Sequence, residues 1–168
     1  VYILNVSRAG ALRSTPVRIS DGLGGFPSGL LQSGNQFGRA LASADLDADG
    51  VPELLVGAET SLANAPGGRG GSVFILWLNA DGTVRTYSRI RENTGGFTAT
   101  PHNFGRSIAV LQSSSVGTIL AVGAISESGS EATTTPGVVY LLRLASNLTV
   151  ASHQTIGETQ LGVSTPYG

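Results

Sequence analysis

The sequence contains no cysteine, no methionine and no lysine, and it has only two histidines, His102 and His153. Without cysteine, disulfide bonds, thiolate catalysis and zinc sites with cysteine ligands are excluded. The two histidines lie far apart in the sequence, so a histidine metal site or a serine–histidine–acid triad has little support. The net charge of −1 gives no electrostatic reason to expect nucleic acid or an anionic membrane as a partner.

Long apolar stretches are also missing. No run reaches the roughly 18 residues that indicate a membrane span, and residues 1–10 lack the basic start and apolar stretch of a signal peptide. With 40% hydrophobic residues, the chain can nevertheless form a domain with a core. It begins without methionine on a strand-like run at Val1, so we expect a piece of a longer chain.

The apolar runs that are present are short and rich in β-branched residues, as in "LLVGA", "SVFILWL", "TILAVGA" and "VVYLLRL". Most are bounded by glycine, proline, serine or asparagine, and no segment has a long 3.6-residue apolar period. This punctuation is typical of strands and turns, and it predicts an all-β fold.

The sequence repeats itself. "FGRALASADLDADGVPELLVGA" begins at Phe37, and "FGRSIAVLQSSSVGTILAVGA" begins at Phe104. Each is followed by a strand-like segment, "SVFILWLNADGTV" from Ser72 and "VVYLLRLASNLTV" from Val138. The chain opens with a third version of that segment, "VYILNVSRAGAL", and 167–168 repeats the aromatic–glycine opening. The chain therefore holds two whole units and parts of two others.

Each whole unit reads as four strands, expected in the first unit at 37–44, 53–58, 72–78 and 83–90. "NADG" between the last two is a strong hairpin signal. Four strands per unit is the plan of a β-propeller blade. Two blades cannot close a propeller, so either further blades belong to a longer chain or several copies assemble in a ring or filament.

The order of motifs resembles the FG-GAP repeat, which builds the seven-bladed propeller of integrin α chains and of related extracellular proteins. Phe-Gly, an Asp-x-Asp-x-Asp-Gly loop, Val-Gly-Ala and Gly-x-Val-Phe/Tyr follow one another in the first unit. The second unit has the same order without the aspartates. The resemblance implies a division into four parts. Residues 1–36 would be the last two strands of a preceding blade with their connecting loop, and 37–103 a blade with the calcium loop. Residues 104–166 would be a blade without that loop, and 167–168 the start of a next repeat.

The stretch DLDADG at 45–50 has the pattern of a calcium loop. Alternate aspartates at positions 1, 3 and 5 can converge on a hard cation, and glycine at position 6 allows the turn around it. Position 7 offers a backbone carbonyl, and position 9 offers a carboxylate. The expected Ca²⁺ ligands are Asp45, Asp47, Asp49, Val51 and Glu53.

Two departures bear on this loop. Position 12 is the apolar Val56 and no helices flank the loop, so it is not an EF-hand. The repeats that it resembles usually carry aspartate where this chain has Glu53. The alternative interpretation is an acidic turn that is only solvated. The second unit has "LQSSSVG" from Leu111, without a carboxylate, and we expect no calcium there; serine hydroxyls at 113–115 can cap the turn.

Catalytic signals are weak, and two glycosylation sequons are present. No nucleophile elbow occurs, and the loop glutamates are interpreted as solvated: Glu59, Glu92, Glu127 and Glu131. We therefore predict a protein that is not an enzyme. Asn5 and Asn147 each begin an N-x-Ser/Thr sequon, and both are predicted where a sugar would face solvent.

The long connections are expected to emerge on one face, opposite the acidic loop: 22–36, 59–71, 91–103 and 125–137. In proteins that the chain resembles, this face binds partners. The prediction is an extracellular or cell-surface adhesion or assembly module, contacting a protein or copies of itself through blade edges and these loops. The alternatives are a carbohydrate-binding propeller, with Phe26, Phe97 and Tyr167 as candidate contacts, and an accessory domain of a secreted hydrolase.

Overall fold

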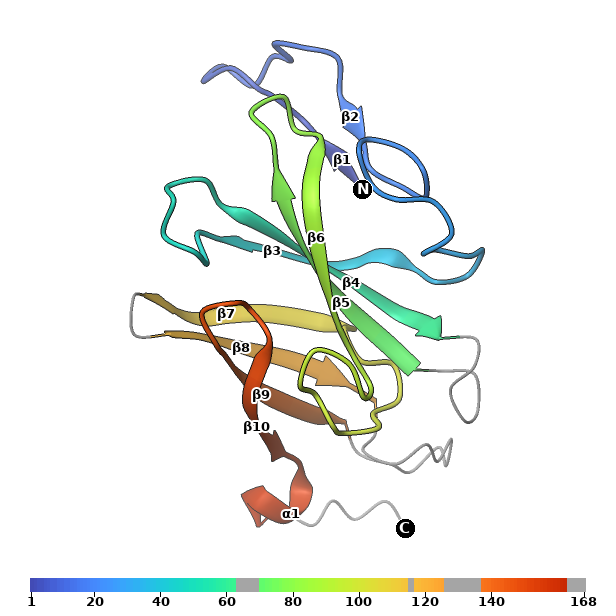
Figure 1. Cartoon of the computed structure of the whole chain (residues 1–168), viewed down its shortest axis with the longest axis vertical. Coiled ribbons are helices and arrows are strands. Elements are labelled where there is room, and N and C mark those ends of the chain that lie inside the picture. Colours follow the sequence, from blue (N-terminus) through green and yellow to red (C-terminus); the bar gives the residue numbers. More distant parts are fainter. Residues whose placement is uncertain (63–69, 115–116, 126–136, 163–168) are drawn as a thin grey trace.

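The computed structural model describes residues 1–62, 70–114, 117–125 and 137–162, and these residues form an all-β structure with one short helix (Figure 1). The acidic loop and the two copies of Phe-Gly-Arg and of Val-Gly-Ala fall within or beside its strands. The elements are β1 (Tyr2–Ile3), β2 (Val17–Arg18), β3 (Phe37–Ala44), β4 (Glu53–Leu62), β5 (Gly70–Leu78), β6 (Val84–Arg91), β7 (Ser107–Ser114), β8 (Gly117–Ala124), β9 (Val138–Leu144), β10 (Val150–Ile156) and α1 (Glu158–Leu161).

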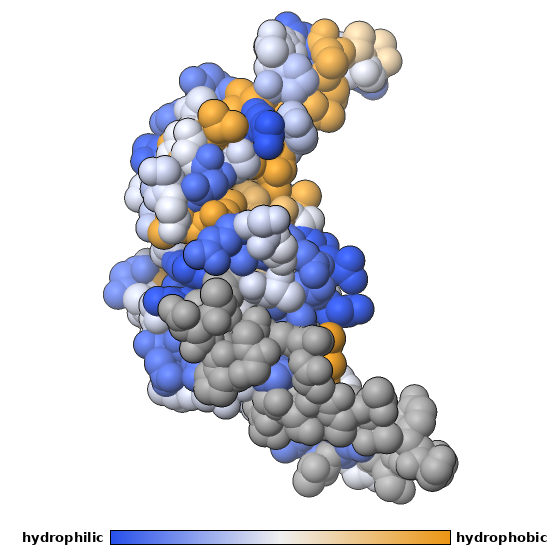
Figure 2. All heavy atoms as spheres, turned by 90° about the vertical axis from the view of Figure 1, so that its right-hand side faces the viewer, coloured by the Kyte–Doolittle hydropathy of each residue, from blue (hydrophilic) through white to orange (hydrophobic). Residues whose placement is uncertain are grey.

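The strands form three antiparallel sheets in chain order. The first pairs β1 with β2, the second runs β3-β4-β5-β6, and the third runs β7-β8-β9-β10. The sheets do not close on one another, and the curved outline in Figure 2 is open on one side. The predicted fold class, four-stranded antiparallel blades of an incomplete propeller, is confirmed. The four strands expected in the first unit are all present. The exact domain boundaries stay a prediction, and 167–168 lies outside the described residues.

The middle sheet is covered on both faces. Seven consecutive residues of β5, from Gly70 to Leu76, are buried, which explains why this strand reads as a continuous apolar run without polar alternation. One face contributes Val56, Phe74 and Leu76 to a cluster shared with the β1–β2 sheet and its connection. The opposite face contributes its apolar residues to the cluster shared with the β7–β10 sheet.

Aromatic rings fill both clusters. In the first, Phe26 and Phe37 lie 5.3 Å apart between ring centroids and pack on Phe74. In the second, Phe97 and Phe104 stack at 4.7 Å and pack on Tyr140. The same three aromatic positions thus recur in both repeats, and they fix how each connecting loop sits on the following sheet.

A Gly-Gly-Phe turn precedes each repeat, and its first glycine accepts a backbone hydrogen bond from the last strand of that repeat. The amide of Val84 donates to the carbonyl of Gly24 at 2.8 Å, and the amide of Val150 donates to that of Gly95 at 2.6 Å. A Cβ on the next glycine, Gly25, would collide with the carbonyl oxygen of Val84. A Cβ on Gly96 would collide with the carbonyl oxygen of Val150 in the same way, so this close approach of two backbones explains why both turns carry glycine at that position.

The N-terminal sheet exposes apolar side chains at one end of the molecule. Leu4, Val6 and Leu12 are each about half exposed, and orange atoms gather at the upper end in Figure 2, where β1 and β2 lie. Among the described residues, no helix is both long enough and apolar enough to span a membrane.

Candidate metal centre

The acidic loop joins β3, which ends at Ala44, to β4, which begins at Glu53. Its curl requires two residues with left-handed backbone conformation, Ala48 with φ 62° and Gly50 with φ 87°. Glycine adopts this conformation without a steric penalty, which accounts for its place after the third aspartate. These two residues let the β3–β4 connection turn sharply, so that its three aspartates lie close together.

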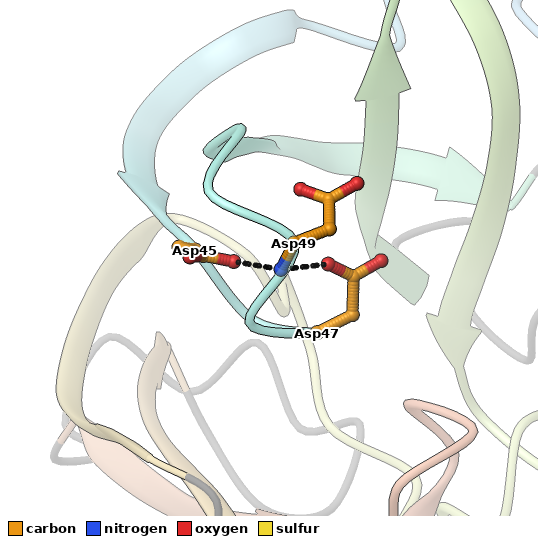
Figure 3. Close-up of side chains that lie close together, drawn as sticks. All are labelled: Asp45, Asp47 and Asp49. Atoms are coloured by element: carbon orange, nitrogen blue, oxygen red, sulfur yellow. Dashed lines mark hydrogen bonds between the residues drawn. The ribbon is translucent and has the colours of Figure 1, made fainter.

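The three aspartates converge, as the alternating pattern predicts. Each offers a carboxylate oxygen, and these oxygens all lie within 4.8 Å of one another. The amide of Asp49 donates to Asp45 Oδ1 at 3.1 Å and to Asp47 Oδ1 at 3.2 Å (Figure 3). The amide of Gly50 donates to Asp45 Oδ2 at 3.0 Å. These amides of the loop's own backbone therefore position the carboxylates of Asp45 and Asp47.

The neighbouring strands support the loop from outside. Trp77 near the end of β5 donates its Nε1–H to Asp47 Oδ2 at 3.0 Å. Arg85 of β6 lies with Nη2 3.9 Å from Asp49 Oδ2, but both side chains are substantially exposed. At such exposure the ion pair stabilises little. Trp77 is the stronger fixed contact, and sequence analysis did not identify it because the residue is distant along the chain.

Glu53 and Val51 occupy different positions from the aspartates. The Glu53 carboxylate is 1% exposed and accepts the amide hydrogen of Leu46 at 2.7 Å from Oε2. Burial raises the pKa of Glu53, and the charges of Asp47 and Asp49 raise it further. The convergent group comprises the aspartates and does not include Glu53. The amide of Val51 donates to Asp49 Oδ1 at 2.8 Å. Their roles as ligands stay predictions.

The donor set suits a hard divalent cation. Calcium prefers carboxylate and carbonyl oxygens, and the three aspartates present only such atoms. Three like charges this close repel one another unless a positive charge lies among them. The carboxylates have oxygens enough to accept backbone hydrogens and still bind an ion. Calcium fits these residues chemically.

The loop also takes part in the joint between the two large sheets. Leu46, between the first two aspartates, is only 8% exposed and belongs to the cluster that contains Leu144 and Leu148. A cleft of about 390 Å³ is lined by 46–48 on one side and by the β9–β10 turn region on the other. The order of this loop therefore bears on how the sheets pack.

The expectation that Glu59 is a solvated loop residue is wrong. The strand β4 continues through this position, and Glu59 is 3% exposed. Arg39 Nε lies 3.6 Å from its Oε1, and Arg106 Nη1 lies 3.3 Å from its Oε2. The two arginines are those of the repeated Phe-Gly-Arg motifs, so both motifs meet at one carboxylate. The repetition of Phe-Gly-Arg was the signal in the sequence that could have pointed to this cluster.

The remaining candidate residues are dispersed. His102 is buried, and His153 packs its ring on Phe97 at 5.1 Å between centroids. Asn5 and Asn147 are exposed, and the latter accepts the amide hydrogen of Thr149 in the β9–β10 turn. Glu92 is the first residue of the connection between β6 and β7. Outside the described residues lie Glu127, Glu131 and Tyr167, and the side chains at 113–115 are also not described.

Comparison with known proteins identifies one repeat. The family model described as FG-GAP repeat matches residues 37–76, which contain β3, the acidic loop, β4 and most of β5. No curated protein matches the chain. The match confirms the resemblance of the first unit, and the acidic loop is an internal part of the matched segment.

Proposed function

Because residues 37–76 form an FG-GAP repeat, we propose that the chain is part of a calcium-stabilised β-propeller that acts as a non-catalytic extracellular adhesion or assembly module. The observation that carries the proposal is the convergence of three carboxylates in a loop of that repeat. FG-GAP repeats often bind Ca²⁺ and are typical of extracellular proteins, in which millimolar-range calcium sites are common.

The proposed role of calcium is structural. Asp45, Asp47 and Asp49 would hold the ion, with Val51 and Glu53 as the further ligands expected from the sequence. Bound calcium neutralises the repulsion among the carboxylates and ties the start of β4 to the end of β3. Because Leu46 is anchored in the core between the sheets, an ordered loop also favours the joint to the β7–β10 sheet.

The proposed partner is a protein, contacted through blade edges and the connections opposite the acidic loop. The aromatic residues suggested for a sugar site argue against the carbohydrate alternative, since Phe26 and Phe97 are 2% and 0% exposed. Buried rings cannot stack on a ligand. The exposed Asn5 and Asn147 are compatible with glycosylation in a secreted chain.

The test is a thermal melt in calcium and in excess chelator, in which the fluorescence of Trp77 is the signal recorded. This residue is the sole tryptophan and contacts Asp47, so its emission reports on the loop. Calcium at about 100 times its dissociation constant should stabilise the fold by about 2.7 kcal/mol. Asp47→Asn and Asp49→Asn should remove most of this effect. A matched control is Asp81→Asn, since Asp81 lies in the β5–β6 turn, outside the convergent group.

The outcomes discriminate clearly. If calcium changes neither the melting temperature nor the emission of Trp77, the acidic loop is a solvated turn. If Asp81→Asn abolishes the effect as fully as Asp47→Asn, the ion does not bind where proposed. A size measurement on the same samples tests self-assembly, because a mass of several chains supports contact through blade edges.

A further inference from the structure

The two repeats carry the same arginine but not the same carboxylate. Each has the arginine of Phe-Gly-Arg, at Arg39 and Arg106. The residue that follows Val-Gly-Ala is Glu59 in the first repeat and Ile125 in the second, and Ile125 is 36% exposed. Two arginines therefore meet at one carboxylate, and the two positive charges and one negative charge leave one net positive charge.

This positive charge faces solvent. The Glu59 side chain is 4% exposed, whereas those of Arg39 and Arg106 are 44% and 46% exposed. Each guanidinium lies against a different oxygen of the Glu59 carboxylate, so the two are neighbours. We call Arg39 and Arg106 the arginine pair. Like charges this close repel one another, and a further anion would favour both.

Most hydrogen-bond donors of the arginine pair are not used by the residues that the structure describes. A guanidinium has five N–H donors in a planar fork. The side-chain hydrogen bond of the pair runs from Arg106 Nη1 to Glu59 Oε2 at 3.3 Å. Arg39 Nε lies 3.6 Å from Oε1, which is an ion-pair distance and too long for a hydrogen bond. The pair can therefore accept a second carboxylate through N–H donors that point to solvent.

The arginine pair lies at the end of the sheets that the proposed function assigns to a partner. Arg39 is near the start of β3 and Arg106 directly precedes β7, whereas the acidic loop follows the end of β3. In Figure 1 the starts of β3 and β7 lie at the right, and the acidic loop lies at the left. The strand between them is about 20 Å long. Because the Debye length is about 8 Å at physiological salt, the aspartates scarcely repel an anion at the pair.

We propose that the arginine pair binds an aspartate or glutamate side chain of a protein partner. The inference rests on the proposed function, and it adds the chemistry of the partner. Glu59 would hold the two guanidiniums from the protein side, and the partner's carboxylate would bind them from the solvent side. An acidic sugar is not favoured, because Phe104 beside Arg106 is 0% exposed and offers no ring for stacking.

The probe is a capped acidic peptide, acetyl-GSDEDGS-amide, and its matched control is the neutral peptide acetyl-GSNQNGS-amide. Each carries an uncharged dye, whose fluorescence anisotropy is followed as the 168-residue chain is added at about 150 mM salt. The acidic peptide should bind about ten-fold more tightly than the neutral one. Because the whole chain has a net charge of −1, general attraction of an anion does not produce this preference.

Substitutions in the cluster should change the affinity in opposite directions. Arg39→Gln and Arg106→Gln should each weaken binding of the acidic peptide about ten-fold, because each removes charged hydrogen-bond donors. Glu59→Gln should tighten binding about three-fold or more, because it keeps both guanidiniums and removes the competing negative charge. The matched control is Arg143→Gln, which removes an exposed arginine of β9 and should bind as the parent does.

A variant with glutamine at all three positions of the cluster separates binding from folding. It contains no buried charge that lacks a partner, so it should melt near the parent and should not distinguish the two peptides. All titrations are run in calcium and in chelator. Preference for the acidic peptide without a calcium effect on melting would refute the calcium site alone, and the reverse result would refute the arginine pair alone.

Three results would overturn the proposal. Equal affinity of the parent for both peptides would show that the arginine pair does not select a carboxylate. If Arg143→Gln weakens binding as much as Arg39→Gln, the peptide responds only to the overall charge of the protein. If Glu59→Gln weakens binding, the anion does not meet the guanidiniums that Glu59 holds.

Discussion

Removing both arginines around Glu59 should destabilise the protein by more than the sum of the two single changes. Arg39 belongs to β3, and Arg106 comes from the segment that enters β7, so the cluster spans the joint between the sheets. The Glu59 side chain is 4% exposed, whereas those of Arg39 and Arg106 are 44% and 46% exposed. The buried Glu59 carboxylate therefore depends on the two arginines to compensate its charge, whereas the arginines are also solvated by water.

The magnitude follows from this asymmetry. At 3.3 Å and an effective dielectric constant of about 20, the gross attraction to Arg106 is about 5 kcal/mol. Solvent screening of the half-exposed guanidinium and desolvation of Glu59 reduce the net contribution to about 1 kcal/mol. Either arginine alone can be lost at about that cost, because the other remains. Losing both leaves a buried charge without either partner, which costs about 3–5 kcal/mol.

The assay is urea unfolding at pH 7 of Arg39→Ala, Arg106→Ala and the double variant. Adding Glu59→Gln to the double variant should recover at least about 1 kcal/mol, because glutamine brings no charge into the site. If the two single effects add and Glu59→Gln recovers nothing, the buried carboxylate is not the source of the coupling, and the reasoning is refuted.

Three further predictions concern separate parts of the molecule. Leu46→Ala should lower the free energy of unfolding by about 2–4 kcal/mol, because it empties space in the core between the sheets; Leu111→Ala, at a 59% exposed position, should change it little in the same urea titration. Backbone hydrogen bonds in the 22–36 loop lower the pKa of Asp21, so its stabilising contribution is present above the ordinary pKa near 3.8 and is lost as pH falls through the depressed folded-state value. Asp21→Asn should therefore flatten the stability curve below about pH 4 in urea unfolding across pH, and equal acid sensitivity of parent and variant would contradict this. Expression in a eukaryotic secretory host should add a glycan at exposed Asn147, so Asn147→Gln should migrate faster in gel electrophoresis; identical migration of parent and variant would exclude that glycan, and Asn5→Gln tests the other sequon separately.

The sequence was sufficient for the strands and for the acidic loop. Short apolar runs between turn residues define strands because their period and punctuation are local properties. The alternation at 45–50 predicted convergent carboxylates for the same reason, since the curl around Gly50 is also local. The repetition of whole motifs then gave the sheet order without any knowledge of long-range contacts.

Contacts between sheets were beyond the sequence argument. Glu59 was interpreted as a solvated loop residue because it follows a Val-Gly-Ala run, but β4 continues past it and two arginines approach from other elements. The contact of Trp77 with Asp47 likewise joins residues from different strands. Position along a chain does not determine which side chains meet across a sheet, since that depends on register and twist.

Three different interactions, spaced along β4, hold the β3–β6 sheet against the β7–β10 sheet. At its start, buried Glu53 holds the amide of Leu46, whose side chain enters the shared core. In the middle, Gly57 lies beneath the backbone of Gly105. Six residues after Glu53, or about 20 Å along the strand, Glu59 gathers the two arginines.

An apolar face alone would allow the second sheet to slide or rotate, because hydrophobic contact is not directional. The crossing at Gly57 and the ion cluster at Glu59 each permit one placement, so together they define the register between the sheets. In stacked repeats, stability is shared between each unit and its interfaces. Cation binding at the acidic loop would therefore stabilise an interface as well as a loop, because Leu46 links the two.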